Sequence, residues 1–198
     1  MAQKAKIITL RIELEEIVPP IWRRIAVDAD ITLRELHHVI QAAFGWADAH
    51  LHEFTIEGRP YVMFDNPNVL EYIEQRSDKP LDDRKTKLQK LARAGLAFDY
   101  QYDFGDRWLH KIKIEEIEAS AEQMGSAHII DGQRACPPED VGGTPGYEDF
   151  LREIQDPSSE QGRDYLRWVG GEFDPEQFDR RSANNTLLRM AWNGWGKI

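Results

Sequence analysis

The chain has 198 residues, of which 41% are apolar, so it can bury a full-sized core without disulfides. Its 35 acidic and 25 basic side chains give a formal net charge of −10, and residues 139–180 alone hold 12 acidic and four basic residues. Nucleic-acid affinity rests mainly on Lys and Arg, so this balance argues against non-specific nucleic-acid binding. The single cysteine, Cys136, excludes an intrachain disulfide, and no apolar run reaches the length of a membrane span, so we expect a cytoplasmic globular protein.

Two alternating segments at the start of the chain are predicted to be strands. Residues 7–14 and 21–27 each place apolar side chains on one face, and a pair of prolines separates them. Proline has no backbone donor, so it suits the entrance of the second strand, which we expect to pair antiparallel with the first. Two further strands are predicted over residues 51–57 and 61–64, joined by a Gly-Arg-Pro turn.

Residues 33–44 have the apolar spacing of a helix. Thr32 and Glu35 stand at the spacing of a capping box, and Gly45 is placed to end the helix. A second helix is predicted over about residues 83–94, with a surface rich in Lys and Arg.

An aromatic alternation over residues 98–114 is the strongest hairpin signal in the chain. A loop with an even number of residues would put Arg and Lys on the aromatic face, so we predict a three-residue loop, Gly105–Arg107. The predicted pairs are Phe104 with Trp108, Tyr102 with His110, Tyr100 with Ile112 and Phe98 with Ile114. Asp103 then lies on the face opposite His110, so the two cannot share a metal unless a bulge intervenes.

Residues 136–146, CPPEDVGGTPG, are too rich in Pro and Gly for regular structure, so we expect a loop there. Helices are predicted after it, the first beginning at Thr144 and Pro145 and the last at Asp174 and Pro175. Because most strands precede these helices, the order of elements favours an α+β fold over alternating βαβ units.

Several sequence blocks resemble the plasmid pRiA4b ORF-3-like family. These blocks are residues 20–24 (PIWRR), 36–46, 50–54 (HLHEF), 102–110 (YDFGDRWLH) and 137–147. The resemblance spans about residues 7–190 and implies an α-β roll and a genomic association with plasmids and insertion elements. It implies no biochemical activity, because gene neighbourhood says nothing about chemistry.

The candidates for ligand binding are His50, His52, Asp103, Asp106, Trp108, His110, Glu139 and Asp140. His50 and His52 project to one side of a strand, and with His110 or a carboxylate they could make a metal site. The competing interpretation is that His52 and His110 are buried, hydrogen-bonded core residues, because both alternate with apolar side chains. The carboxylates could hold Mg²⁺ as in a nuclease, or they could simply cap turns and loop amides.

We therefore predict an α-β roll with a curved, mainly antiparallel sheet. A strand-rich core over about residues 7–118 and a helical part over about 144–192 are expected to form one domain across residues 1–198. The function we favour is a binding or interaction module for an unknown protein or small-molecule ligand, with the mobile-element association that the resemblance implies. The alternative is a metal-dependent hydrolase acting on nucleic acid or a phosphoester. We assign no catalytic residue, metal or cofactor, and we expect Cys136 to be structural because no base is visible to activate it.

Overall fold

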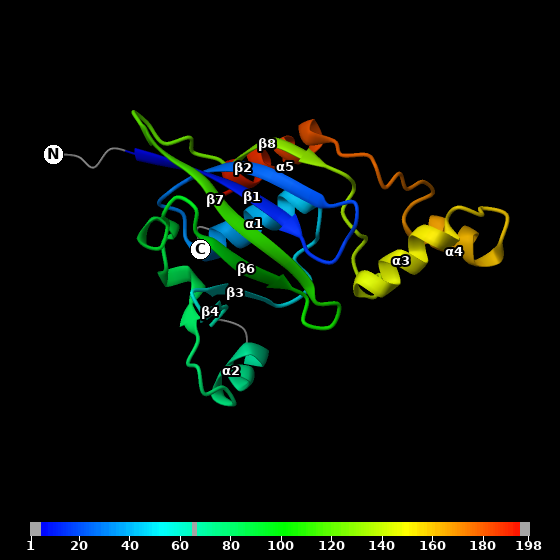
Figure 1. The fold of residues 1–198 in the computed structure, drawn as a ribbon, viewed down its shortest axis with the longest axis horizontal. Helices are drawn as coiled ribbons and strands as arrows, with labels where there is room; N and C mark the ends of the chain where they lie inside the picture. Colours follow the sequence, from blue (N-terminus) through cyan, green and yellow to red (C-terminus); the bar gives the residue numbers. More distant parts are fainter. Residues whose placement is uncertain (1–4, 65–66, 195–198) are drawn as a thin grey trace.

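A sheet of eight strands forms the centre of the computed structural model, which describes residues 5–64 and 67–194 (Figure 1). The elements are β1 (Ala5–Leu14), β2 (Ile21–Asp28), α1 (Leu33–Phe44), β3 (His52–Ile56), β4 (Arg59–Val62), α2 (Pro67–Glu74), β5 (Leu81–Asp82), β6 (Ala97–Tyr102), β7 (Trp108–Ser120), β8 (His128–Gln133), α3 (Gly143–Glu153), α4 (Glu160–Trp168) and α5 (Arg180–Trp192). The strand order is β5-β4-β3-β6-β7-β1-β2-β8, and neighbouring strands are antiparallel except for β4 with β5. The α+β class and the mainly antiparallel sheet are confirmed.

The helices are unevenly distributed around this sheet. Helix α1 lies against one face, and α5 packs beside it in contact with both α1 and β8 (Figure 1). Helices α3 and α4 contact each other and project beyond the end of the sheet. Within the described ranges, no helix has the length and apolar character needed to cross a membrane.

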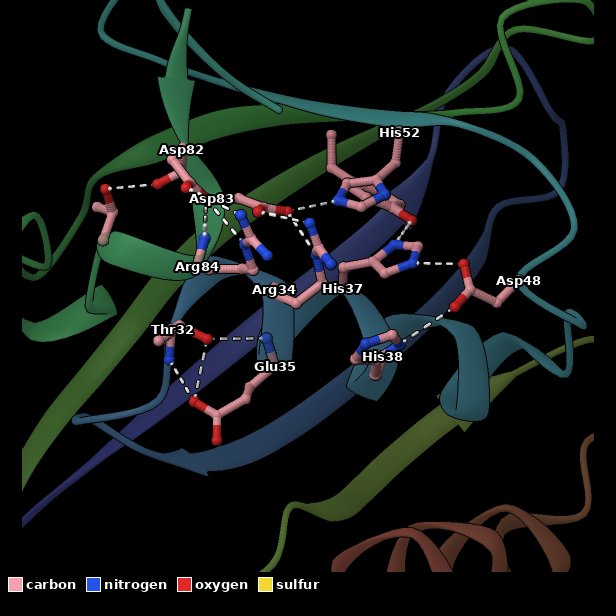
Figure 2. Close-up of polar contacts among 12 residues, drawn as sticks. Thr32, Arg34, Glu35, His37, His38, Asp48, His52, Asp82, Asp83 and Arg84 are labelled. Carbon is pink, nitrogen blue, oxygen red and sulfur yellow. Dashed lines mark hydrogen bonds and ion pairs between the residues drawn. The ribbon is translucent and has the colours of Figure 1, made fainter. Parts of the chain in front are cut away.

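The first predicted helix and both of its caps are confirmed. Thr32 Oγ1 accepts a hydrogen bond from the Glu35 backbone N–H at 3.1 Å, and the Glu35 carboxylate accepts one from the Thr32 N–H at 2.7 Å (Figure 2). Gly45 ends the helix in the left-handed conformation, with φ of 91°. The apolar face of α1 joins the same buried core as the inward rows of β1 and β2.

The β6–β7 hairpin has the predicted inward row but a different register. The observed pairs are Tyr102 with Trp108, Tyr100 with His110 and Phe98 with Ile112. Each aromatic residue therefore meets a partner two positions earlier than predicted, and the loop runs from Asp103 to Arg107. The loop length remains odd, so His110 stays on the buried face. Asp103 and Arg107 both have positive φ, and the Arg107 N–H donates to the Asp103 carbonyl at 2.7 Å, which closes the longer loop.

The predicted helix over residues 83–94 is wrong. Only two short 3-10 turns form there, at Asp83–Lys85 and Leu88–Lys90. Between and beside these turns the backbone bonds to the entrance of α1, as where the Leu88 N–H donates to the Ile31 carbonyl at 2.8 Å and the Leu33 N–H donates to the Thr86 carbonyl at 2.9 Å. Tertiary partners thus satisfy some of the backbone groups that a continuous helix would have paired internally.

The last helix begins later than predicted. Its N-cap is Asp179, whose carboxylate accepts two backbone N–H bonds at 2.9 Å. Asp174, the predicted cap, instead accepts from the Glu176 N–H at 2.9 Å and forms a turn ahead of the helix. The short-range Asp-Pro signal therefore marks a turn and not a helix start.

A buried arginine connects α1 to the end of β8, a strand that the sequence did not predict. Arg23 Nε donates to the Ala43 carbonyl at 3.0 Å. The two terminal nitrogens of Arg23 donate to the carbonyls of Gln133 and Arg134, each at 2.9 Å. The guanidinium also lies 3.7 Å from the centroid of the Phe178 ring. Because these partners come from distant segments, Arg23 holds β8 beside β2.

Candidate functional site

Three of the candidate residues point into the core. His52, Trp108 and His110 are at most 2% exposed. His52 Nε2 lies 2.9 Å from Asp83 Oδ2, and His110 Nδ1 lies 3.1 Å from the Trp108 carbonyl. Both histidines are therefore buried and hydrogen-bonded, as their alternation with apolar residues indicated.

Four other candidates meet where β6 ends and β3 begins. His50 Nε2 lies 2.9 Å from Asp140 Oδ1 and 3.6 Å from Asp103 Oδ2. It also lies 3.9 Å from Glu139 Oε1. We call these four residues the His50 cluster. Ligand atoms of His50, Asp103 and Asp140 all lie within 4.8 Å of one another, so a single ion can contact all three.

The loop between β8 and α3 reaches this cluster by docking on the β6–β7 loop. The Gly142 N–H donates to Asp106 Oδ2 at 2.9 Å. Gly143 allows the close approach, because its φ is 68° and a Cβ there would lie 2.6 Å from the Asp106 carbonyl oxygen. Asp106, a candidate ligand from the sequence, thus positions the loop that carries Glu139 and Asp140.

The His50 cluster has an excess of negative charge and an unsatisfied nitrogen. Nε2 of His50 is buried, and although it lies 2.9 Å from Asp140 Oδ1, neither this contact nor any other in the described part of the chain has the alignment of a hydrogen bond. The Tyr102 hydroxyl donates to Glu139. Burial, together with this contact, raises the pKa of Tyr102 above its usual range. A cation would offset the negative charge that the carboxylates bring together.

A second polar cluster, which sequence reasoning missed, lies between α1 and the sheet (Figure 2). His37 Nε2 lies 2.7 Å from Asp48 Oδ1, and His38 Nδ1 lies 3.3 Å from Asp48 Oδ2. His37 also stacks on His52, with 3.6 Å between the ring centroids. Because His37 donates from Nε2, its Nδ1 accepts from the Tyr100 hydroxyl, 2.8 Å away.

Burial and hydrogen bonding set the charge states of this second cluster. Burial lowers the pKa of His37 to about 3, so His37 is neutral. Burial alone would raise the pKa of Asp48, but hydrogen bonds from the two neighbouring histidines hold it well below its usual range. Asp83 behaves in the same way, and its pKa falls to about 2 because His52 and Arg34 bond to its carboxylate.

Two known proteins resemble this chain over most of its length. The uncharacterised protein y4hQ of Sinorhizobium fredii is 35% identical over 189 residues, which is 94% of this chain and 91% of that protein. The crystal structure of MM3350, a protein of unknown function from Methanosarcina mazei, matches with a TM-score of 0.77 and 33% identity, covering 90% of this chain and 98% of that one. The family model for plasmid pRiA4b ORF-3-like proteins matches residues 6–182, and the chain therefore belongs to that family.

Proposed function

We propose that the protein is a metal-dependent binding module that holds a divalent transition-metal ion at the His50 cluster. The observation that supports this most directly is the convergence of carboxylates on His50 Nε2, a buried atom without a hydrogen bond in the described ranges. A mixed set of nitrogen and oxygen donors suits Zn²⁺ or Mn²⁺ better than Mg²⁺, which prefers oxygen alone. The sequence alone led us to assign no metal. We favour a metal now because the loops that carry His50, Asp103 and Asp140 lie together in the fold.

The proposed ligands are His50, Asp103 and Asp140, whose donor atoms all lie within 4.8 Å of one another. Three protein ligands leave coordination positions for water or for a bound molecule, as open metal sites do. Glu139 lies farther from His50 and accepts from the Tyr102 hydroxyl, so we expect it to orient the site rather than to bind the ion.

Asp140 also lines an open depression of about 780 Å³ beside α4. Glu160 and Asp164 add acidic groups to its lining, and Tyr165 and Trp168 add aromatic surface. A molecule held by the ion can extend into this depression. Because carboxylates line it, a neutral or cationic ligand is favoured over a polyanion.

A metal-dependent hydrolase is the second candidate, and the open coordination positions favour it, because an ion-bound water becomes a nucleophile at neutral pH. The acidic depression argues against nucleic acid as its substrate. We expect at most weak, sequence-independent DNA binding at physiological salt. A gel shift that shows sub-micromolar affinity for random duplex, falling steeply with added salt, would contradict this expectation and favour the mobile-element association.

Metal binding can be measured by elemental analysis of the purified full chain and by titrating the metal-free protein with Mn²⁺ and Zn²⁺. We expect one ion per chain. His50→Ala and Asp103→Asn should each weaken binding by at least about tenfold. His128→Ala and Asp99→Asn are matched controls at the surface of the same sheet, and they should bind like the native chain.

Thermal unfolding of all four variants separates loss of the site from loss of the fold. Absence of saturable binding by either ion would contradict the proposal. So would equal affinities in folded His50→Ala, folded Asp103→Asn and the two controls, because the ion would then sit elsewhere.

A further inference from the structure

A second cavity, separate from the His50 cluster, lies between α1 and α5. Its volume is about 840 Å³, which is in the range of small-molecule sites. Ala42, Trp46 and Met190 give it apolar surface, and Asp48 and Arg189 give it charged groups. We call it the α1–α5 pocket, and among the described residues it shares no lining residue with the His50 cluster or with the depression beside α4.

Asp48 gives the α1–α5 pocket a fixed negative charge. Its side chain is 34% exposed, and its two oxygens lie 2.7 Å from His37 Nε2 and 3.3 Å from His38 Nδ1. Because His37 is buried and neutral, it orients the carboxylate without cancelling its charge. Each carboxylate oxygen has two lone pairs, so both can accept a further hydrogen bond from a ligand.

Arg189 brings the opposite charge to the pocket from α5. Its side chain is exposed, and its guanidinium has no hydrogen bond or ion pair with any other described residue. A guanidinium can bind a carboxylate through two parallel hydrogen bonds. The pocket therefore combines an anchor for a cation, an anchor for a carboxylate, and apolar surface.

We propose that the α1–α5 pocket binds an apolar amino acid or short peptide with free ends, whose ammonium group pairs with Asp48 and whose carboxylate pairs with Arg189. The apolar side chains of the ligand pack against Trp46 and Met190. A ligand that lacks one charged end leaves the matching protein group desolvated without a partner, so the pocket discriminates by both ends. This inference does not depend on metal binding at the His50 cluster.

Isothermal titration of the full chain with leucine and dileucine, each also as its N-acetyl form and as its amide, tests the ligand chemistry. We expect saturable binding of leucine or dileucine with a Kd below about 1 mM. Blocking either end of the tighter ligand should weaken binding by at least about tenfold. Tighter binding of leucine identifies a free amino acid as the ligand, and tighter binding of dileucine identifies a peptide.

Variants of the two charged residues test which end each one binds. Arg189→Gln should erase the preference for the free carboxylate over the amide and keep the preference for the free amine. Asp48→Asn should do the reverse. Arg181→Gln, exposed on the same helix outside the pocket, is the matched control and should bind like the native chain.

Because Asp48 also bonds to His37, thermal unfolding checks the fold of its variant. Arg189 is exposed, so its variant keeps the test valid even if Asp48→Asn does not fold. Failure of both leucine and dileucine to bind saturably would overturn the proposal. A preference for the free carboxylate that persists in Arg189→Gln would overturn it as well.

Discussion

Lowering the pH from 7 to 5 should remove a large part of the folding stability, because burial lowers the pKa of three histidines, His37, His52 and His110. His37 and His110 are fully buried, and burial lowers the pKa of each from 6.5 to about 3. Below pH 6.5 the unfolded chain binds protons that these folded-state imidazoles do not. Above pH 6.5 these two histidines therefore do not lower the free energy of unfolding. As the pH falls from 6.5 toward 3, proton binding to the unfolded chain lowers the free energy of unfolding progressively.

The size of the effect follows from the protonation of the unfolded chain. Between pH 7 and pH 5, each of these histidines should lower the free energy of unfolding by about 2 kcal/mol. His37 and His110 together should lower it by roughly 4 kcal/mol, a large share of the ~5–15 kcal/mol typical of a folded domain. His52 adds to this loss, because burial lowers its pKa as well. The pKa values of Asp48 and Asp83 are lowered in the folded chain, so their contributions stay intact above about pH 4 and are lost only below it.

Urea unfolding followed by tryptophan fluorescence at pH 7, 6 and 5 measures this loss. His110→Phe removes one buried titrating group and should reduce the loss by about 2 kcal/mol. His128→Gln changes an exposed histidine and should leave the loss unchanged. A decrease of less than about 1 kcal/mol in the native chain, or the same decrease in His110→Phe, would refute the burial argument.

Three further changes test the fold and the docked loop. Arg23→Lys should lower the free energy of unfolding by about 3 kcal/mol in urea titrations, because an ammonium cannot replace the guanidinium bonds to four separate carbonyls. Gly143→Ala should weaken metal binding at the His50 cluster and cost about 2 kcal/mol, since the new Cβ displaces the loop from Asp106; unchanged metal titrations would contradict this. Cys136→Ala should change stability by no more than about 1–2 kcal/mol and retain any bound metal in elemental analysis, because it loses only packing.

The sequence by itself determined the elements whose signals are local. Alternation over residues 7–14 and 21–27 identified β1 and β2, because a half-buried strand has a period of two. The caps at Thr32 and Gly45 located α1, because they satisfy backbone groups within one turn of the helix. The sequence also predicted that the β6–β7 loop has an odd number of residues, since an even number would bury charged side chains.

Only part of the candidate site could be predicted from the sequence. The sequence named His50, Asp103, Glu139 and Asp140 by residue type and indicated by alternation that His52 is buried, but it could not tell that the four residues meet. The adjacent histidines of α1 were the one available signal for the second cluster, and nothing local linked them to Asp48.

Only the tertiary structure decided which of these signals prevailed. The observed register of the β6–β7 hairpin differs by two residues from the predicted register, but the same side chains face inward. Alternation specifies which face is buried, whereas the closure of the loop decides the exact partners. Residues 83–94 do not form a continuous helix, because the segment bonds to the entrance of α1 and to the buried side chains of Arg34 and His52. The His50 cluster forms because the docking of Gly142 on Asp106 brings together loops far apart in sequence, and contacts at that separation leave no periodic trace in either segment.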